Sequence, residues 1–157
     1  MKRLTVTLMA LILLLTATFI WGGQQPADAE AVRSEAVKGF EEILDLWRDG
    51  RFDELYNRTL ISGKDTKESF TRRMSSARLK PSCCWEKMQD VGVSVRSGSS
   101  VVIRARLGLD GPGDMEFKTK SFKLSKEDGI WRIARSEILA LAEARKKGGK
   151  QRRSKVK

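Results

Sequence analysis

Tyr56, Asp45 and Asp90 are the side chains of this 157-residue sequence that come nearest to a catalytic set. A tyrosine hydroxyl can donate a hydrogen bond into a pocket, and a buried carboxylate beside a suitable partner can move a proton. The sequence has no histidine, the commonest general base and transition-metal ligand. Histidine triads and histidine-based zinc sites are therefore excluded. We expect no catalytic residue, metal or cofactor, and we interpret the tyrosine as a core residue and both acids as solvated.

Two adjacent cysteines, Cys83 and Cys84, form the second group with chemical potential, and Trp85 follows them. In an exported protein, cysteines favour a disulfide. Neighbouring residues bridge only through a small ring that departs from ordinary disulfide geometry. Three readings stay open, namely one buried and one exposed thiol, a vicinal disulfide, or a bridge to a second copy. Metal binding is not expected, because no second cysteine pair or histidine is present.

The C-terminal segment, residues 145–157, has the plainest chemistry of the chain. The whole sequence has a net charge of +11, but residues 30–144 hold 21 basic and 19 acidic residues, a difference of only +2. The tail contains no acidic residue and no apolar anchor, so we expect a disordered polycation that contacts an anionic membrane or cell-envelope surface. A solubilising role is the alternative. Its cations are Arg145, Lys146, Lys147, Lys150, Arg152, Arg153, Lys155 and Lys157.

The first 29 residues predict an export signal or a membrane anchor. Lys2 and Arg3 precede a run from Leu4 to Trp21 without a charged residue, and Ala27-Asp28-Ala29 fits a cleavage site before Glu30. The same run, residues 4–21, is just long enough to tether the chain to the inner membrane if it is not cleaved. Either reading places the rest of the protein in the periplasm or another extracytoplasmic space. We therefore expect no resident nucleic-acid partner.

Three helices are expected at the start of the mature chain. Apolar residues recur at spacings of three and four over residues 28–49, with charged residues between them, and Gly50 ends this helix. Residues 51–58 predict a short second helix. A third helix begins after Thr66, whose side chain can cap it, and cannot extend past Pro81.

After these helices the hydrophobic period changes to two, which predicts strands over residues 91–95, 101–109, 115–124 and 131–133. Asp128-Gly129 is a strong hairpin signal between the last two. The order of elements predicts an α+β domain over residues 30–144, with N-terminal helices packed on a curved antiparallel sheet of about four strands. Residues 138–144 fit either a strand end or a helical turn.

One strand shows a conflict of parity. Met115 and Phe117 alternate in one phase, whereas Phe122 and Leu124 follow the opposite phase. If all four apolar side chains face the core, a β-bulge near Lys120-Ser121 must reconcile them. The inward positions of the sheet are then Val, Ile, Ala, Leu, Phe and Trp, without a catalytic acid.

The segment DGRFDELY (residues 49–56) and the closing hairpin KEDGIWRI (residues 126–133) resemble the nuclear transport factor 2-like superfamily. The resemblance covers about residues 30–140. It implies a cone-shaped, SnoaL-like domain in which helices and a curved sheet enclose a pocket, and it implies that a homodimer can form through the sheet. Secreted and membrane-attached bacterial members with this ending are common in the superfamily.

The superfamily includes isomerases, cyclases and dehydratases that place Asp, His or Tyr inside the cone. This chain departs from that pattern, so we expect an exported or anchored non-catalytic domain that binds a ligand or another protein. The ligand stays unidentified. The alternative is a small isomerase- or dehydratase-like enzyme that uses Tyr56 and a carboxylate. The candidates for the pocket lining are Trp47, Tyr56, Trp85 and Trp131, although we expect the tryptophans chiefly to fill the core.

Overall fold

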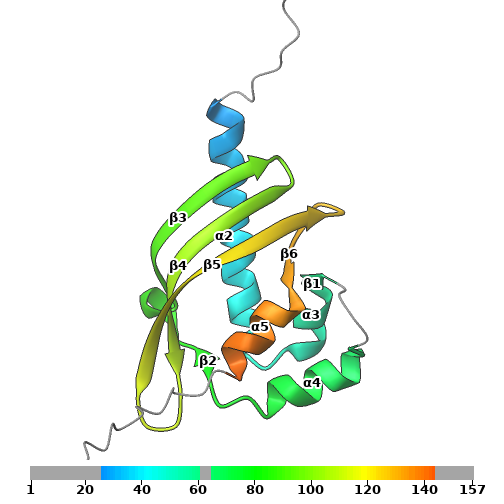
Figure 1. The fold of residues 1–157 in the computed structure, drawn as a ribbon, viewed down its shortest axis with the longest axis vertical. Coiled ribbons are helices and arrows are strands. Elements are labelled where there is room, and N and C mark those ends of the chain that lie inside the picture. The colour runs from blue at the N-terminus through cyan, green and yellow to red at the C-terminus, as the bar shows by residue number, and fades with distance from the viewer. Residues whose placement is uncertain (1–25, 61–64, 144–157) are drawn as a thin grey trace, which may run out of the picture.

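A computed structural model of the protein describes residues 26–60 and 65–143. Three helices precede the four long strands, as expected of an α+β domain, and one more helix, α5, follows the last strand (Figure 1). The helices are α2 (Pro26–Arg48), α3 (Phe52–Asn57), α4 (Lys67–Ser75) and α5 (Arg135–Ala142), and a 3₁₀ turn, η1, spans Cys84–Glu86. Residues 138–142, whose conformation the sequence left open, therefore belong to a helix.

Over the residues described, the sheet has six strands and is mixed. The four long strands are β3 (Met88–Ser97), β4 (Ser100–Asp110), β5 (Met115–Glu127) and β6 (Ile130–Ala134), and they pair antiparallel in this order. Two short strands extend the sheet. The first, β1 (Thr59–Leu60), runs parallel to β6, and the second, β2 (Lys80–Pro81), pairs antiparallel with the end of β4.

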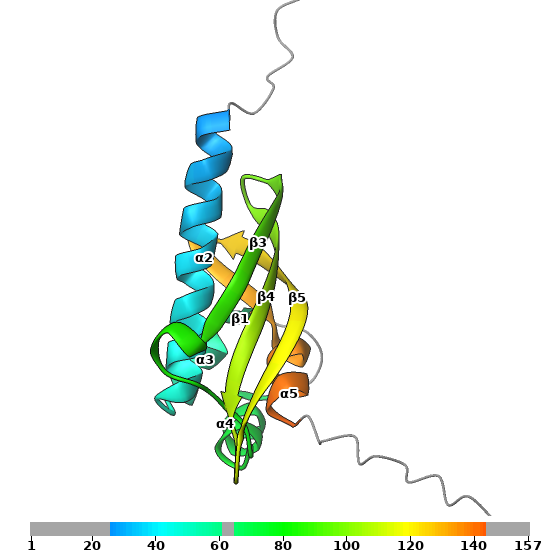
Figure 2. The same ribbon diagram turned by 90° about the vertical axis from the view of Figure 1, so that its left-hand side faces the viewer.

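Helix α2 covers one face of the sheet, which we call the inner face (Figures 1 and 2). The core lies between them, and the rings of Phe40 on α2 and Phe122 on β5 have centroids 4.8 Å apart. Burying each such side chain contributes about 1.5–3 kcal/mol. The other buried apolar residues include Ile43, Leu44, Trp47, Ile103, Leu107, Leu124, Trp131 and Ile133.

Helix α2 is held against β6 by close packing at Gly39 and by hydrogen bonds from the Arg58 side chain. An ideal Cβ on Gly39 would lie 2.8 Å from the Cβ of Trp131, so the missing side chain allows the close approach. Arg58 follows α3 and donates to the backbone oxygens of Gly39 and Trp131, both at 3.3 Å. Its own carbonyl accepts a hydrogen bond from Ile133. The start and the end of the described chain are thus joined around one arginine.

Several local predictions are confirmed. Thr66 caps α4, because its hydroxyl accepts a hydrogen bond from the backbone N–H of Ser69 at 3.2 Å. Asp128 and Gly129 have φ values of +51° and +76° and turn the chain from β5 into β6, as a primed two-residue hairpin requires. Gly50, with φ of +74°, follows the end of α2.

The predicted bulge near Lys120-Ser121 is wrong. The pairing of β4 with β5 runs without a shift from Ser100 opposite Ser125 to Asp110 opposite Met115. Met115 and Phe117 therefore lie on the outer face of the sheet, where they are 39% and 38% exposed. A register shift occurs in β3 instead, where Asp90 adopts a φ of +51°.

Over residues 26–60 and 65–143, none of the helices combines the length and the apolar character that a membrane crossing needs. The charge-free run of residues 4–21 and the basic tail of residues 145–157 lie outside the described residues, whereas the predicted cleavage site Ala27-Asp28-Ala29 lies within α2.

Candidate functional site

A hollow of about 830 Å³ lies where α4, α5 and the turn between β4 and β5 meet. Residues 76–79 form one wall and the turn that contains Gly111, Pro112 and Asp114 forms another. The volume falls in the range of small-molecule sites. Its complete lining is Arg73, Ser76, Ala77, Arg78, Leu79, Gly111, Pro112, Asp114, Glu116, Ala142 and Glu143.

The floor of the hollow is apolar and closely packed. Leu79 is buried there, and an ideal Cβ on Gly111 would lie 2.8 Å from the Leu79 Cδ2. Gly111 therefore allows the turn to approach residues 76–79. This contact fixes the distance between two walls of the hollow.

Charged side chains surround this floor. Arg73 binds Glu143 at 2.8 Å and lies 3.8 Å from Asp65, so it joins α4 to the end of α5. Arg78 and Asp114 form no ion pair within the described part of the chain. The hollow thus offers to a ligand a cation and an anion that have no ionic partner among the described residues.

A row of charged residues continues from the hollow along the inner face of β5. Because the register is unshifted, Glu116, Lys118 and Lys120 lie opposite Leu109, Leu107 and Ala105 of β4. Lys118 Nζ is 3.5 Å from the Glu116 carboxylate, yet it is buried and makes no hydrogen bond among the described residues. A buried ammonium group without such a bond is costly.

Glu137 of α5 stands beside this row. Burial raises the pKa of its carboxyl above the usual 4.5, while the charge of Lys120 and a hydrogen bond from the backbone of Lys123 oppose the rise. Its Oε2 atom is buried without a hydrogen-bond partner in the described chain. Desolvation therefore outweighs the attraction of the nearby cation.

Sequence reasoning missed this charged row because it placed the bulge in β5. With the bulge, the apolar residues Met115 and Phe117 faced inward and the lysines faced solvent. An uninterrupted alternation from Phe122 back to Glu116 would have placed every even-numbered residue on the inner face. That simple reading was the available signal.

Tyr56 packs against a buried arginine. Among the described residues, its hydroxyl makes no hydrogen bond to a carboxylate. Its hydroxyl donates to the backbone oxygen of Asp65 at 3.5 Å, and the Arg135 guanidinium stands 4.1 Å from the centre of its ring. Arg135 is only 1% exposed and donates to Thr59 Oγ1 and to the Asp65 carbonyl. The geometry is that of a structural cluster rather than a catalytic pair.

The tryptophan candidates divide into two groups. Trp47 and Trp131 fill the core, and the ring N–H of each is buried without a hydrogen-bond partner among the described residues. The expectation that Trp85 fills the core is wrong, because this side chain is 73% exposed. It lies on η1, outside the regular strands. None of the pocket candidates, including Tyr56, lines the hollow described above.

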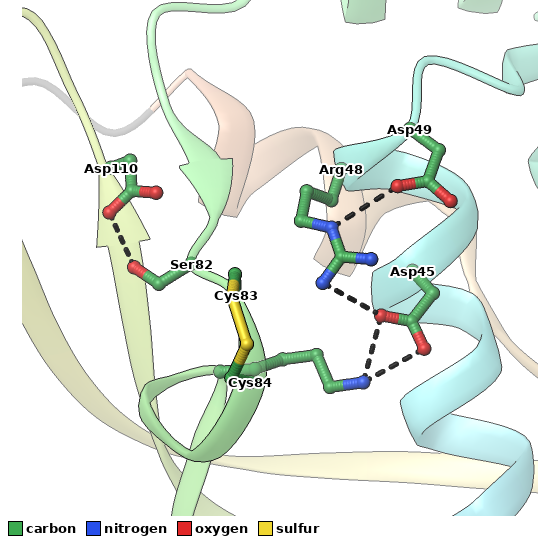
Figure 3. Close-up of a disulfide and its surroundings, with 8 residues drawn as sticks. Asp45, Arg48, Asp49, Ser82, Cys83, Cys84 and Asp110 are labelled. Carbon is green, nitrogen blue, oxygen red and sulfur yellow. Dashed lines mark hydrogen bonds and ion pairs between the residues drawn. A yellow bond between two sulfur atoms is a disulfide. The ribbon is translucent and has the colours of Figure 1, made fainter.

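Cys83 and Cys84 are joined by a disulfide between adjacent residues, with Cα atoms 3.8 Å apart (Figure 3). Both residues are exposed, and Cys84 has a φ of +59°. The adjoining η1 turn packs on β4, where an ideal Cβ on Gly108 would overlap the Glu86 carbonyl oxygen. The absence of a side chain at Gly108 therefore allows this turn to pack closely on β4.

The two candidate acids occupy surface positions. Asp45 receives hydrogen bonds from Lys87 Nζ at 2.8 Å to both of its oxygens and lies 3.3 Å from Arg48 (Figure 3). It ties the chain after η1 to α2. Asp90 is exposed at the register shift of β3. Over the described residues no three acidic or cysteine side chains gather as a metal site requires.

Comparison with known proteins leaves the family open. No protein-family description and no curated protein sequence matches the chain. Among solved structures, one similar chain is a proposed polyketide cyclase from Xanthomonas campestris pv. campestris. It is 15% identical, with a TM-score of 0.43, and the match covers 72% of this chain and 99% of that one. A likeness of this degree carries no argument, so the nuclear transport factor 2-like resemblance stays a prediction.

Proposed function

We propose that this protein is a non-catalytic binding domain of nuclear transport factor 2-like type, which receives a ligand or a protein segment in the hollow between α4, α5 and the β4–β5 turn. The observation that carries the proposal is the lining of this hollow. An apolar floor at Leu79 lies beside Arg78 and Asp114, which have no ionic partner in the described chain. Apolar floors with a few polar groups at the rim are typical of binding sites.

The chemistry of the rim favours a ligand that carries both charges, such as a zwitterion or a polar peptide segment. Arg78 would bind its anionic group and Asp114 its cationic group. A titration of the ¹⁵N-labelled chain with the dipeptide lysyl-glutamate at about 1 mM tests this, with the uncharged peptide N-acetyl-alanyl-alanine amide as the control. We expect amide shift changes at residues 76–79 and 111–116 that are larger with lysyl-glutamate.

A blocking variant sharpens the experiment. Ser76 is exposed on the wall of the hollow, so Ser76→Trp should fill the space and abolish the shift changes. Ser94→Trp, at an exposed position of β3, is the matched control and should keep them. Shift changes that persist in Ser76→Trp, or that gather elsewhere on the domain, would contradict binding at the hollow.

The second part of the proposal concerns the location of the protein in the cell and the surface that its tail contacts. The charge-free run of residues 4–21 supports export or tethering to the inner membrane, and the cations of residues 145–157 support contact with an anionic envelope surface. N-terminal sequencing of native protein from separated cell fractions tests the first point. Co-sedimentation with phosphatidylglycerol and with phosphatidylcholine vesicles tests the second. Salt-sensitive binding to the anionic vesicles, lost when residues 145–157 are removed, is the expected result.

The enzymatic alternative has weaker support. A general base and Tyr56 would need to meet in one pocket, whereas the Tyr56 hydroxyl bonds to a backbone carbonyl and its ring stacks under Arg135. Glu137 is the carboxylate with a raised pKa, and it stands beside Lys120. Binding without catalysis accounts for these positions more simply.

A further inference from the structure

One edge of β5 is open over most of its length. β4 pairs with β5 from Met115 to Ser125, but on the other edge β6 pairs with it only from Leu124 to Glu127. Figure 1 shows β6 beside one end of β5, while the other end continues with β4 into a hairpin. Residues 115–123 therefore have no neighbouring strand on this edge in the described chain.

The backbone groups that face the open edge belong to the odd-numbered residues. The N–H of Lys126 donates to Ser99 at the start of β4, so even-numbered residues direct their backbone groups toward β4. Backbone direction alternates along a strand, and the register with β4 is unshifted. Met115, Phe117 and Thr119 therefore present N–H and C=O groups to the open edge.

The charges along this segment are antisymmetric about Phe117. The sequence from Asp114 to Lys120 reads DMEFKTK, with two acids before the phenylalanine and two lysines after it. If a second copy pairs antiparallel with Phe117 opposite Phe117, Glu116 lies opposite Lys118 of the second copy. Asp114 then lies opposite Lys120. Each opposite-charge pair of this kind stabilises a sheet.

The outer face fits the same register. Phe117 and Met115 are among the large apolar side chains left exposed by the fold. In this pairing the two Phe117 rings meet across the symmetry axis, and Met115 lies opposite Thr119. Aromatic cross-strand pairs add to the stability of a sheet.

The neighbouring registers are less favourable, because each opposes one pair of like charges and gives two opposite-charge pairs where the Phe117 register gives four. A shift of two residues in one direction places Glu116 opposite Glu116, and the opposite shift places Lys118 opposite Lys118. Lysines on a strand edge ordinarily prevent unwanted pairing. In this chain they disfavour other partners and other registers while one self-complementary register stays favourable.

We propose that two copies of this protein associate through antiparallel pairing of their β5 edges about Phe117, which joins the two sheets into one. The interface is isologous, as in most homodimers, because the same segment serves both copies. The inference does not depend on ligand binding at the hollow, although Asp114 and Glu116 belong to both surfaces.

Charge reversal tests the register. Sedimentation equilibrium of the purified full chain should show a dimer, and Glu116→Lys or Lys118→Glu should each raise its dissociation constant about tenfold, because two symmetry-related like-charge pairs replace two opposite-charge pairs. The double variant Glu116→Lys/Lys118→Glu should restore the dimer. A thermal unfolding curve for each variant shows that the fold is retained.

Cysteine cross-linking provides an independent measurement. Directly opposed residues that exchange hydrogen bonds have Cα atoms about 5.5 Å apart, within reach of a disulfide. Phe117→Cys should therefore give a covalent dimer on mild oxidation, whereas wild type and Thr119→Cys should not. A monomeric wild-type chain, or a dimer that neither single reversal weakens, overturns the proposal and leaves the edge bare or open to another protein's strand.

Discussion

Gly39 of α2 packs directly against Trp131 of β6, since a Cβ on the glycine would lie 2.8 Å from the tryptophan Cβ. Alanine ordinarily stabilises a helix by about 1 kcal/mol relative to glycine. We expect Gly39→Ala to destabilise the domain instead, by about 1–3 kcal/mol, because the helix must move away from the sheet. Urea unfolding measures the change. Lys38→Ala, at the exposed neighbouring position, is the control and should leave stability nearly unchanged.

Replacing Arg135 with lysine should destabilise the domain. Its guanidinium donates to Thr59 and Asp65 and stacks on Tyr56 while almost fully buried. Lysine lacks the planar group and the fixed donors, so Arg135→Lys should lower the free energy of unfolding by about 1–3 kcal/mol. The exposed Arg72→Lys serves as the control. Equal stability of the two variants would show that the buried cluster contributes little.

Gly108 should be as sensitive as Gly39. Alanine at this position places a Cβ against the Glu86 carbonyl oxygen, so that the backbone of η1 or of β4 must shift. We expect Gly108→Ala to displace η1, to cost about 1–3 kcal/mol and to shift the fluorescence of Trp85. Gly92→Ala, on β3 with open space around the added methyl group, should change neither property.

Glu137 should give the domain a pH-dependent stability. Its pKa is higher in the folded than in the unfolded chain, so the folded state holds the proton more tightly. Stability then falls as the pH rises from about 4.5 through the folded-state pKa. Glu137→Gln removes this loss and should be more stable than wild type at neutral pH, by less than about 1 kcal/mol because the group is partly exposed. The two proteins should converge at pH values below 4.5. Parallel curves across the whole range would contradict this assignment.

The disulfide between Cys83 and Cys84 can be checked by mass. Both side chains are exposed, so free thiols would react readily with an alkylating reagent. We expect no label on the native chain, and two labels after treatment with a dithiol reductant. Labelling without reduction would show that the cysteines are thiols.

Local signals predicted the elements of this fold well. The periodicity of α2, the cap at Thr66 and the Asp128-Gly129 turn each depend on residues close in sequence. The error in β5 arose from the assumption that apolar residues face the core. Phe117 lies on the outer face, where the Arg106 guanidinium stands 4.2 Å from its ring centre.

The candidate site was harder to predict because its parts are distant in sequence. The hollow forms only where α4, the β4–β5 turn and the end of α5 lie together, and no local sequence pattern predicts that they do. The burial of Arg135 likewise depends on Asp65, 70 residues earlier. An arginine at the start of a helix is ordinarily exposed, so sequence reasoning had no reason to select it.

The junction at Arg58 has a consequence for the order of folding. Arg58 bonds to Gly39 and to Trp131, and within residues 26–60 and 65–143 the one strand that pairs with β1 is β6. A growing chain that has not yet released β6 therefore leaves β1 without its strand partner and α2 without its contacts to Trp131. Contacts of such long sequence separation form slowly. The domain can therefore complete its folding only after β6 has been synthesised. A nascent chain that stops before residue 130 would stay accessible to proteases and chaperones.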